Sequence, residues 1–283
     1  MMSKGIIPIN KPSGWTSFDV VNKIKHLMHM RRVGHLGALD PMATGVLLVT
    51  VGPATKLFDV MQEKVKTYIA EFEFGWLTDT LDSTGETLSK ENVVIYQDEI
   101  EAVLPKLIGD IDQIPPKYSA KSINGKRAYD LARQNIEFDL PAKRVSIYSI
   151  ELLSYDKNVL KVQVSCGSGT YIRSIGRDIA AMFGTTATMT SLVRTSVGQF
   201  DLSKALSIDG LTSDNIIDSV LPIDKALDLP ILELDDIEAK RILNGQTLIL
   251  DRDDGQYKLN VDDDTIALVK INNKHGKMSV FLG

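Results

Sequence analysis

The sequence predicts an α+β fold, and three observations lead to it. Strand-like and helix-like segments do not alternate one for one along the chain, which argues against a doubly wound parallel sheet. The strand-like segments 143–155 and 159–166 follow each other after a short turn, as in a hairpin. The last fifty residues look like short strands, separated by the turn sequences Asp254-Gly255 and Asn272-Asn273.

The N-terminal segment is expected to contribute two strands and a helix. Residues 5–9 and the β-branched, apolar residues 46–51 predict strands, the second of them buried. Residues 16–28 predict a helix because Thr16 and Asp19 have the spacing of a capping box. The apolar residues of that helix fall on one face: Val20, Val21, Ile24, Leu27 and Met28.

The next segments predict a strand, a loop and a helix. Residues 67–74 alternate between apolar and polar side chains, which is typical of a half-buried strand. Residues 77–86 are rich in Thr, Asp, Ser and Gly and predict a solvated surface loop, with too few ligands for a cation site. Residues 98–108 predict a helix that Pro105 shortens or kinks.

The second half of the chain predicts a polar insertion, a hairpin, a helix and a small terminal unit. Residues 117–135 are polar and basic, and residues 171–183 predict a helix with Ile172, Ile175, Ile179, Met182 and Phe183 facing inward. Pro222 and Pro230 bracket an expected linker. We therefore expect a large domain over residues 1–225 and a small β-rich domain over residues 230–283.

Composition favours a globular protein of the cytoplasm. The chain has 283 residues and 43% hydrophobic content, with no run of 18 apolar residues and no signal-peptide core. No membrane span is therefore expected. Cys166 is the only cysteine, which rules out an internal disulfide framework and suits a reducing compartment. It ends an alternating strand, so we interpret it as a small core residue.

Charge is unevenly distributed along the chain. The net charge is −5, which by itself does not favour a nucleic-acid partner. However, residues 1–66 hold nine basic and four acidic residues, whereas residues 201–283 hold nine basic and sixteen acidic ones. The N-terminal excess is compatible with RNA phosphates meeting this end of the molecule, and Lys11, Arg31, Arg32 and Lys66 are the candidate phosphate contacts.

The most informative segment is residues 34–45, GHLGALDPMATG. It places Asp40 on a turn, because proline at position 41 restricts the residue before it. Glycines flank the turn and a buried strand follows it, so the carboxylate is expected on a loop braced by the core. Loops held by a rigid scaffold are where catalytic groups tend to lie.

This segment resembles the active-site segment of the TruB-type tRNA pseudouridine synthases, and eleven of its twelve positions fit. The exception is Leu36, where that family more often has Thr or Gly. Four other segments resemble the family in the expected order: residues 5–14, 66–68, 114–120 and 169–173. The resemblance implies a pseudouridine-synthase fold with a mixed, mostly antiparallel central sheet flanked by helices, an RNA-contacting insertion over about residues 117–142, and a short PUA-like domain over 230–283.

The resemblance also implies roles for individual residues. Asp40 corresponds to the catalytic carboxylate, and Arg173 to the arginine that pairs with it. Tyr68 corresponds to the ring that stacks on the target uracil, and Tyr171 to a second ring of the substrate pocket.

Two further correspondences concern the flipped base. His35 corresponds to the residue that fills the gap left by the flipped nucleotide. Leu192 corresponds to a pocket position ahead of Arg194-Thr195, although it is equally interpretable as a core leucine.

The chemistry of such an isomerisation fits a chain with one special carboxylate and no cofactor site. The base must leave the RNA stack, its N-glycosidic bond must break, and the ring must re-attach through C5. A carboxylate suffices for the sugar chemistry, by direct attack at C1′ or through a glycal. Residues 167–172 resemble a dinucleotide fingerprint but lack its third glycine, and His26 and His29 lack a third metal ligand, so no cofactor or metal is expected.

The function implied by the resemblance is isomerisation of uridine 55 in the T loop of tRNA, by a monomer without an obligatory protein partner. Two alternatives stay open. One is a dyskerin-type synthase guided by an H/ACA ribonucleoprotein, although the basic tails usual there are absent. The other is a catalytically silent module that binds or folds tRNA.

Overall fold

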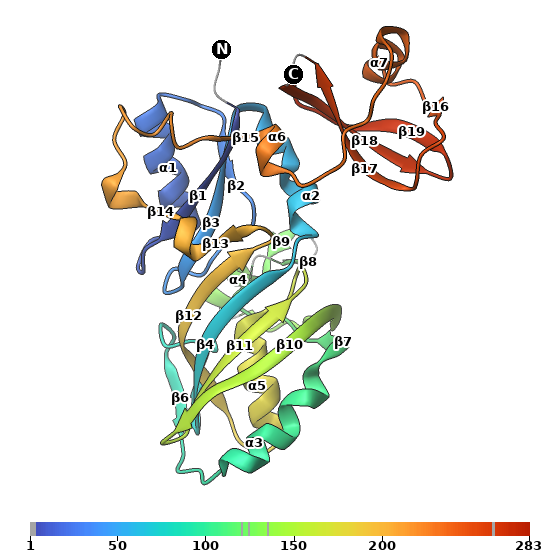
Figure 1. Cartoon of the computed structure of the whole chain (residues 1–283). Helices are drawn as coiled ribbons and strands as arrows, with labels where there is room; N and C mark the ends of the chain where they lie inside the picture. Colours follow the sequence, from blue (N-terminus) through green and yellow to red (C-terminus); the bar gives the residue numbers. More distant parts are fainter. Residues whose placement is uncertain (1–3, 120, 124, 135, 262–263) are drawn as a thin grey trace.

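The computed structural model describes residues 4–119, 121–123, 125–134, 136–261 and 264–283. Its largest feature is a mixed sheet, to which eleven strands contribute among the described residues, with the core order β14-β1-β3-β12-β4-β11-β10-β7. Most neighbours are antiparallel, while β1–β14 and β3–β12 are parallel. The sheet confirms the predicted fold class (Figure 1).

The elements of the large domain follow in chain order. The strands are β1 (Gly5–Lys11), β2 (Val33–His35), β3 (Thr44–Val51), β4 (Lys66–Phe74), β5 (Trp76–Thr78), β6 (Thr87–Lys90), β7 (Gly109–Gln113), β8 (Ser122–Ile123), β9 (Lys126–Arg127), β10 (Lys143–Asp156), β11 (Val159–Cys166), β12 (Ala187–Val197), β13 (Phe200–Asp201), β14 (Leu206–Ser207) and β15 (Leu221–Pro222). The α-helices are α1 (Ser17–Met28), α2 (Phe58–Gln62), α3 (Gln97–Val103), α4 (Ala128–Arg133), α5 (Ile172–Ala181) and α6 (Ile223–Ala226), and the 3₁₀ turns include η1 (Gly52–Leu57) and η2 (Leu104–Leu107).

The predicted elements of the N-terminal half are confirmed. Helix α1 begins with the expected capping box, in which Thr16 and Asp19 exchange side-chain and backbone hydrogen bonds. Helix α3 stops at Val103, and the chain continues through Pro105 as the 3₁₀ turn η2. Strands β1, β3 and β4 match the predicted segments within two residues.

The sheet has a separate apolar core on each face. On one face, α1, α3 and α5 cover alternate residues of the strands, including Ile7, Leu47 and Phe72. On the other face, residues such as Ile6 and Leu48 pack with η1, α2 and α6. The two-residue period of the strands distributes Ile6 and Ile7 to opposite faces, and both are fully buried.

Helix α5 lies unusually close to the sheet. A Cβ atom at Gly176 would stand 2.2 Å from the ring of Phe72 on β4, so only glycine allows this approach. Ile172, Ile175 and Ile179 are buried as predicted, and Phe183 packs partly buried against the same core. Met182 was predicted to face inward, but it is 44% exposed because the helix ends at Ala181.

Residues 77–86 differ from the predicted surface loop. They form the end of β5 and the turn of the β5–β6 hairpin, and Asp82 in this turn is buried. Asp82 also forms an isolated parallel bridge to Met189 of β12. The turn is therefore folded back onto the sheet, and its polar composition serves hydrogen bonds inside the protein.

The C-terminal unit is a small antiparallel sheet with one helix. It contains β16 (Leu248–Ile249), β17 (Gly255–Val261), β18 (Asp264–Asn272), β19 (His275–Phe281) and α7 (Asp236–Leu243), which was not predicted. Asn273 and Lys274 have positive φ in the β18–β19 turn, which confirms the hairpin predicted there. The other expected turn, Asp254-Gly255, instead leads into β17.

This C-terminal unit is packed against the large domain (Figure 1). Leu268 and Leu282 are fully buried in the core cluster that also holds Ile6 and Leu57. The segment expected to be a linker forms α6, with Ile223 buried in the same cluster. Three lysines cross the contact: Lys4 pairs with Asp264 at 2.6 Å, Lys56 donates to the carbonyl of Phe281, and Lys258 donates to the carbonyls of Asp224 and Leu227.

Replacing Leu282 by alanine is therefore expected to destabilise the whole chain. Removing a fully buried leucine side chain costs about 2–5 kcal/mol in the free energy of unfolding. Urea denaturation monitored by circular dichroism measures this loss. Ile249→Ala is the matched control, since that side chain is 78% exposed and its loss should change stability little. Equal midpoints for the two variants would show that the C-terminal unit does not share the core.

Candidate active site

The loop that carries Asp40 is held in place on both sides of the carboxylate. Before it, the backbone N–H of Leu39 donates to Ser17 Oγ at 2.9 Å, and Ser17 Oγ donates back to the Leu39 carbonyl. After it, the Pro41 carbonyl accepts from the Gly14 N–H at 2.9 Å and from Lys11 Nζ at 3.1 Å. Asp40 itself closes the turn, because its carbonyl accepts from the Ala43 N–H.

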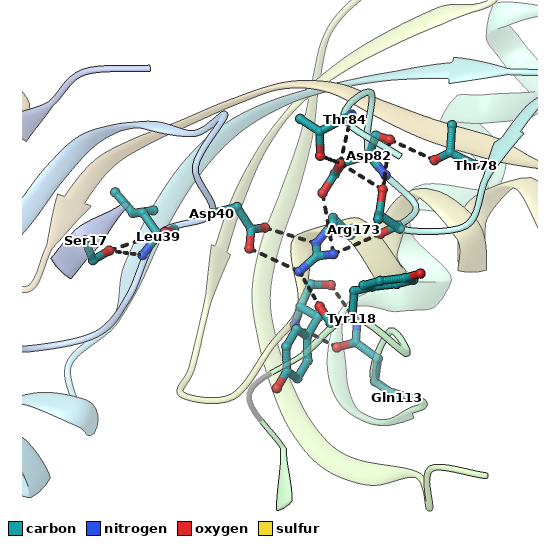
Figure 2. A network of polar contacts seen from close by, with 11 residues as sticks. Ser17, Leu39, Asp40, Thr78, Asp82, Thr84, Gln113, Tyr118 and Arg173 are labelled. Carbon is teal, nitrogen blue, oxygen red and sulfur yellow. Dashed lines mark hydrogen bonds and ion pairs between the residues drawn. The ribbon is translucent and has the colours of Figure 1, made fainter. Parts of the chain in front are cut away.

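Arg173 of α5 faces Asp40 with two of its nitrogen atoms. Nε lies 3.0 Å from Oδ2 and Nη2 donates to Oδ1 at 3.1 Å, so the pair is bidentate (Figure 2). The guanidinium is 7% exposed, while the Asp40 side chain keeps 33% exposure. The arginine is thus held inside the protein, and the carboxylate remains reachable from solvent. These two residues come from segments 133 positions apart, and the structure brings them together as the resemblance implied.

A second carboxylate, Asp82, lies on the other side of the same guanidinium. Its Oδ2 is 3.5 Å from Arg173 Nη1, and its side chain is only 6% exposed. Its Oδ1 accepts from the Thr84 N–H at 3.0 Å and from Thr80 Oγ1 at 2.9 Å (Figure 2). The Thr–Asp–Ser–Thr composition of this turn indicated only a loop, and the role of Asp82 emerges from burial beside Arg173.

Two backbone carbonyls complete the surroundings of Arg173. Nη1 donates to the Thr80 carbonyl at 2.9 Å and Nη2 to the Tyr118 carbonyl at 3.0 Å. A buried charge is costly unless every donor finds a partner, and here two carboxylates and two carbonyls surround the guanidinium. Arg173 therefore has one well-defined position, from which it aims the Asp40 carboxylate.

Gln113 positions the start of α5 and was not predicted. Its side chain is 1% exposed, accepts from the Tyr171 N–H at 2.8 Å and donates to the Tyr171 carbonyl (Figure 2). Tyr171 is the N-cap residue of α5 and makes no side-chain cap, and Gln113 fixes its position by bonding both its backbone N–H and its carbonyl. The end of β7 in this way fixes the turn that precedes Arg173.

Burial raises the pKa of Asp40 above its ordinary value. The positive charge of Arg173 opposes this effect, and the negative charge of Asp82 adds to it. The net direction is upward because burial outweighs the charge of Arg173, which is shared between two carboxylates. Asp40 therefore holds a proton more tightly than an ordinary aspartate.

Two tyrosines lie near the carboxylate. Tyr68 on β4 is half-buried against the core that α5 covers, and burial raises the pKa of its phenol while the charge of Arg194 opposes the rise. Burial likewise raises the pKa of the Tyr171 phenol, and the nearby Ser119 hydroxyl opposes the rise. Tyr68 pairs across the β4–β12 ladder with Arg194, whose guanidinium donates to the carbonyls of Gly37 and Ala38 ahead of Asp40, and Tyr171 comes two residues before Arg173.

His35 and Leu192 are near the site in different ways. His35 ends β2, five residues before Asp40, and burial lowers the pKa of its imidazole, which keeps the ring neutral. Its Nδ1 finds no hydrogen-bond partner among the described residues. Leu192 is 6% exposed in the core and pairs with Ala70 of β4, two residues from Tyr68. It is a core leucine at the edge of the site.

Two of the four expected phosphate contacts are wrong. Lys11 is fully buried and donates to the carbonyls of Pro12, Trp15 and Pro41, which uses all three of its N–H groups. Lys66 is 7% exposed and donates to the Gln62 carbonyl. Burial lowers the pKa of each ammonium to about 8. Arg31 and Arg32 are exposed and remain candidates.

The expected RNA-contacting insertion forms a small unit beside the site. Its described part contains the short hairpin β8–β9 and helix α4, and Ala120 of the matched segment lies outside the described residues. A groove of about 710 Å³ separates residues 136–140 from the β5–β6 hairpin, with Ile114, Pro116 and Tyr118 along its wall. The carbonyl of Tyr118 links this insertion directly to Arg173.

Among the described residues, no three His, Cys, Asp or Glu side chains are grouped to hold a metal ion. In the same part of the chain, no helix has the length and apolar character needed to cross a membrane.

Comparison with known proteins places this site in context. Residues 25–172 match the model of the TruB family pseudouridylate synthase N-terminal domain. The chain is 41% identical to the tRNA pseudouridine synthase B of Clostridium kluyveri over 242 residues, which covers 85% of this chain and 84% of that protein. It is 37% identical to the protein of the same name from Caldanaerobacter subterraneus subsp. tengcongensis, over 100% of this chain and 95% of that one.

Solved structures share the fold over nearly the whole chain. A chain of a Cbf5-Nop10-Gar1 complex superposes with a TM-score of 0.72 at 23% identity, covering 99% of this chain and 84% of that chain. A chain from an H/ACA RNP bound to a substrate RNA superposes with a TM-score of 0.71 at 22% identity. These two similarities concern the fold.

Proposed function

The chain belongs to the TruB family of pseudouridylate synthases, and we propose that it isomerises a uridine of the tRNA T loop, position 55, to pseudouridine. The proposal rests on the Asp40 carboxylate, which is partly exposed to solvent while the buried Arg173 holds it in place. A module that only binds RNA has no need of a carboxylate aimed by an internal arginine, since buried ion pairs are costly to build.

The reaction moves one bond and one proton. The N1–C1′ bond breaks, a C5–C1′ bond forms, C5 loses a proton and N1 gains one, so no redox step is required. Asp40 assists at C1′, either by forming an ester there as N1 leaves with the electron pair or by promoting a glycal. Tyr68 is the group proposed to carry the proton, because it stands across the ladder from Arg194, which holds the Asp40 loop, and a positioned phenol can act as a general acid or base.

The substrate must be flipped out of its stack before Asp40 can reach C1′. We propose that His35 fills the space of the flipped nucleotide, that Tyr68 and Tyr171 bracket the uracil, and that Leu192 closes the pocket. Arg31 and Arg32, which are exposed on the N-terminal part, are proposed to contact phosphates.

The deciding experiment uses the purified chain alone. It is mixed with an unmodified T-arm hairpin that carries tritium at C5 of the target uridine, and released tritium is counted. Release without cofactor, guide RNA or protein partner supports a stand-alone synthase. Release only after adding an H/ACA guide RNA would favour the guided alternative, and tight hairpin binding with no release would favour a silent binding module.

The pH dependence of kcat/KM is expected to show an acidic limb above the ordinary titration range of an aspartate. Asp40 must be ionised to act, and its pKa in the folded protein is raised, so activity is lost on acidification earlier than for an ordinary carboxylate. Single-turnover rates with limiting hairpin at a series of pH values measure the midpoint. In Asp82→Asn the midpoint should move down, because the negative charge that raises the pKa of Asp40 is gone.

Asp82→Asn is also expected to slow the reaction at neutral pH by about 10²-fold, the cost of a small misplacement of reacting groups. The amide cannot pair with Arg173, so the guanidinium is no longer held from both sides. Single-turnover rates at saturating hairpin measure the effect. Asp79→Asn, in the same hairpin but without contact to Arg173, is the matched control. Equal rates for Asp82→Asn and wild type would show that Arg173 is held in place without Asp82.

A further inference from the structure

Arg194 is the largest fully buried side chain of the protein and has no part in the reaction described above. It lies on β12 and is 2% exposed. No carboxylate of the described chain forms an ion pair with it. An arginine cannot lose its proton in a protein, so a permanent charge is buried here without a counter-ion.

The guanidinium holds the beginning of the Asp40 loop. Nε donates to the Val46 carbonyl at 2.7 Å, Nη2 to the Gly37 carbonyl at 3.1 Å and Nη1 to the Ala38 carbonyl at 3.4 Å. The backbone of Arg194 also lies against Gly45, where a Cβ atom would stand 2.2 Å from the Arg194 carbonyl oxygen. The loop is therefore attached to β12 at both of its ends.

The same side chain lies beside Tyr68. Arg194 and Tyr68 are directly paired residues of the antiparallel β4–β12 ladder, so their side chains extend from the same face of the sheet. The next residues on that face, Leu192 and Ala70, are paired as well. One side chain in this way touches the loop of the catalytic carboxylate and adjoins the ring expected to contact uracil.

The other charged groups near these two residues come from three elements. Cys166 of β11 and Asp40 face Tyr68 together with Arg194, while Lys11, Lys66 and His35 face Arg194. Burial raises the pKa of the Cys166 thiol to about 11, so it is neutral at physiological pH. Lys66 and Lys11 lose protons more easily than ordinary lysines, and the imidazole of His35 is neutral. Arg194 is therefore the positive charge beside Tyr68 that does not change with pH.

We propose that Arg194 is a positioning residue that fixes the Asp40 loop relative to Tyr68 and stabilises the Tyr68 phenolate. The proposal rests on the function proposed above. Once the C5–C1′ bond has formed, the neutral phenol gives its proton to N1, and the resulting phenolate beside Arg194 accepts the proton that leaves C5, which restores the phenol. A buried cation without a carboxylate partner suits this step, since a carboxylate would neutralise the charge that the phenolate needs.

Two substitutions separate the charge from the hydrogen bonds. Arg194→Gln keeps a hydrogen-bond donor but loses the positive charge. Arg194→Lys keeps the charge but loses the planar guanidinium that donates to three carbonyls. The glutamine variant is expected to lower the single-turnover rate by about 10²-fold at neutral pH, with hairpin affinity unchanged. The lysine variant is expected to keep the pH profile of the wild type at a reduced rate. Arg144→Gln, which removes an exposed guanidinium on β10, is the control for net charge.

A double-mutant cycle with Tyr68→Phe tests whether Arg194 acts through the hydroxyl. If it does, Arg194→Gln costs far less in the Phe background than in the wild type. Equal costs in both backgrounds would overturn the proposal. A wild-type chain that forms no pseudouridine would instead reject the proposed function, and with it the proposed role of Arg194.

A readout independent of turnover is the ultraviolet titration of tyrosinate. The difference between the wild type and Tyr68→Phe isolates the Tyr68 phenol. This phenol is expected to ionise at higher pH in Arg194→Gln than in the wild type, and at nearly the wild-type pH in Arg194→Lys. If the glutamine variant does not fold, the lysine variant decides, because a large upward shift despite the retained charge would contradict the proposal.

Discussion

Asp40→Asn is expected to reduce the single-turnover rate of pseudouridine formation by about 10⁴-fold or more, the usual cost of losing a covalent-catalysis group. The amide has nearly the shape of the carboxylate but is neither a nucleophile at C1′ nor a negative charge. Arg173 keeps its contacts to Asp82 and to the carbonyls of Thr80 and Tyr118, so the surrounding structure is expected to stay folded as in the wild type. Tritium release from the C5-labelled hairpin at saturating protein measures the rate.

The control for this variant must separate chemistry from binding. Hairpin affinity measured by filter binding should be almost unchanged, because a single amide replaces one partly exposed carboxylate. Asp59→Asn, on the exposed face of α2, removes the same charge away from the site and should retain full activity. Turnover of Asp40→Asn within tenfold of the wild type would remove Asp40 from the reaction.

Substitution of Tyr68 is expected to have the second largest effect. If its hydroxyl carries a proton, Tyr68→Phe loses about 10²–10⁴-fold in single-turnover rate while still binding the hairpin. Tyr68→Leu loses the ring as well, and with it a stacking contribution of about 1–3 kcal/mol per base. We expect the first outcome, since Tyr68 is the cross-strand neighbour of Arg194, the buried cation that holds the Asp40 loop.

The pair of variants distinguishes two roles of one ring. A Phe variant that runs at nearly the wild-type rate, beside a slow Leu variant, would leave Tyr68 as a stacking platform only. In that case the proposed link between Arg194 and the phenolate would fail with it. Rates at saturating hairpin and a separate binding measurement for each variant keep affinity apart from chemistry.

Much of the site could be predicted from the chain because its chemistry is local. The Asp40 turn needs only twelve consecutive residues, in which proline and glycine restrict the backbone directly. The capping box of α1 and the early end of α3 at Pro105 are equally short-range. Alternation along β4 and β11 likewise revealed which side of each strand is buried.

The sequence-based predictions that were wrong concern polar residues that are buried in the structure. Lys11, Lys66 and Asp82 have the composition of a solvated surface, and nothing in their neighbours along the chain indicates otherwise. Their burial results from packing against distant segments: Asp82 against Arg173, and Lys11 against the carbonyl of Pro41. Burial of a polar group depends on partners that satisfy it, and two of these partners, Pro41 for Lys11 and Arg173 for Asp82, are 30 and 91 positions away along the chain.

By itself, the sequence determined the turn of Asp40, the faces of the strands and, through its resemblance to a family, the pairing of Asp40 with Arg173. Only the tertiary structure decided that β12 enters between β3 and β4, and this register sets Arg194 opposite Tyr68 and beneath Gly37. Local preferences restrict a backbone over a few residues, whereas strand register is selected by the whole buried face at once. The electrostatics of the site follow from that register, because a charge acts on whichever groups the fold brings near it.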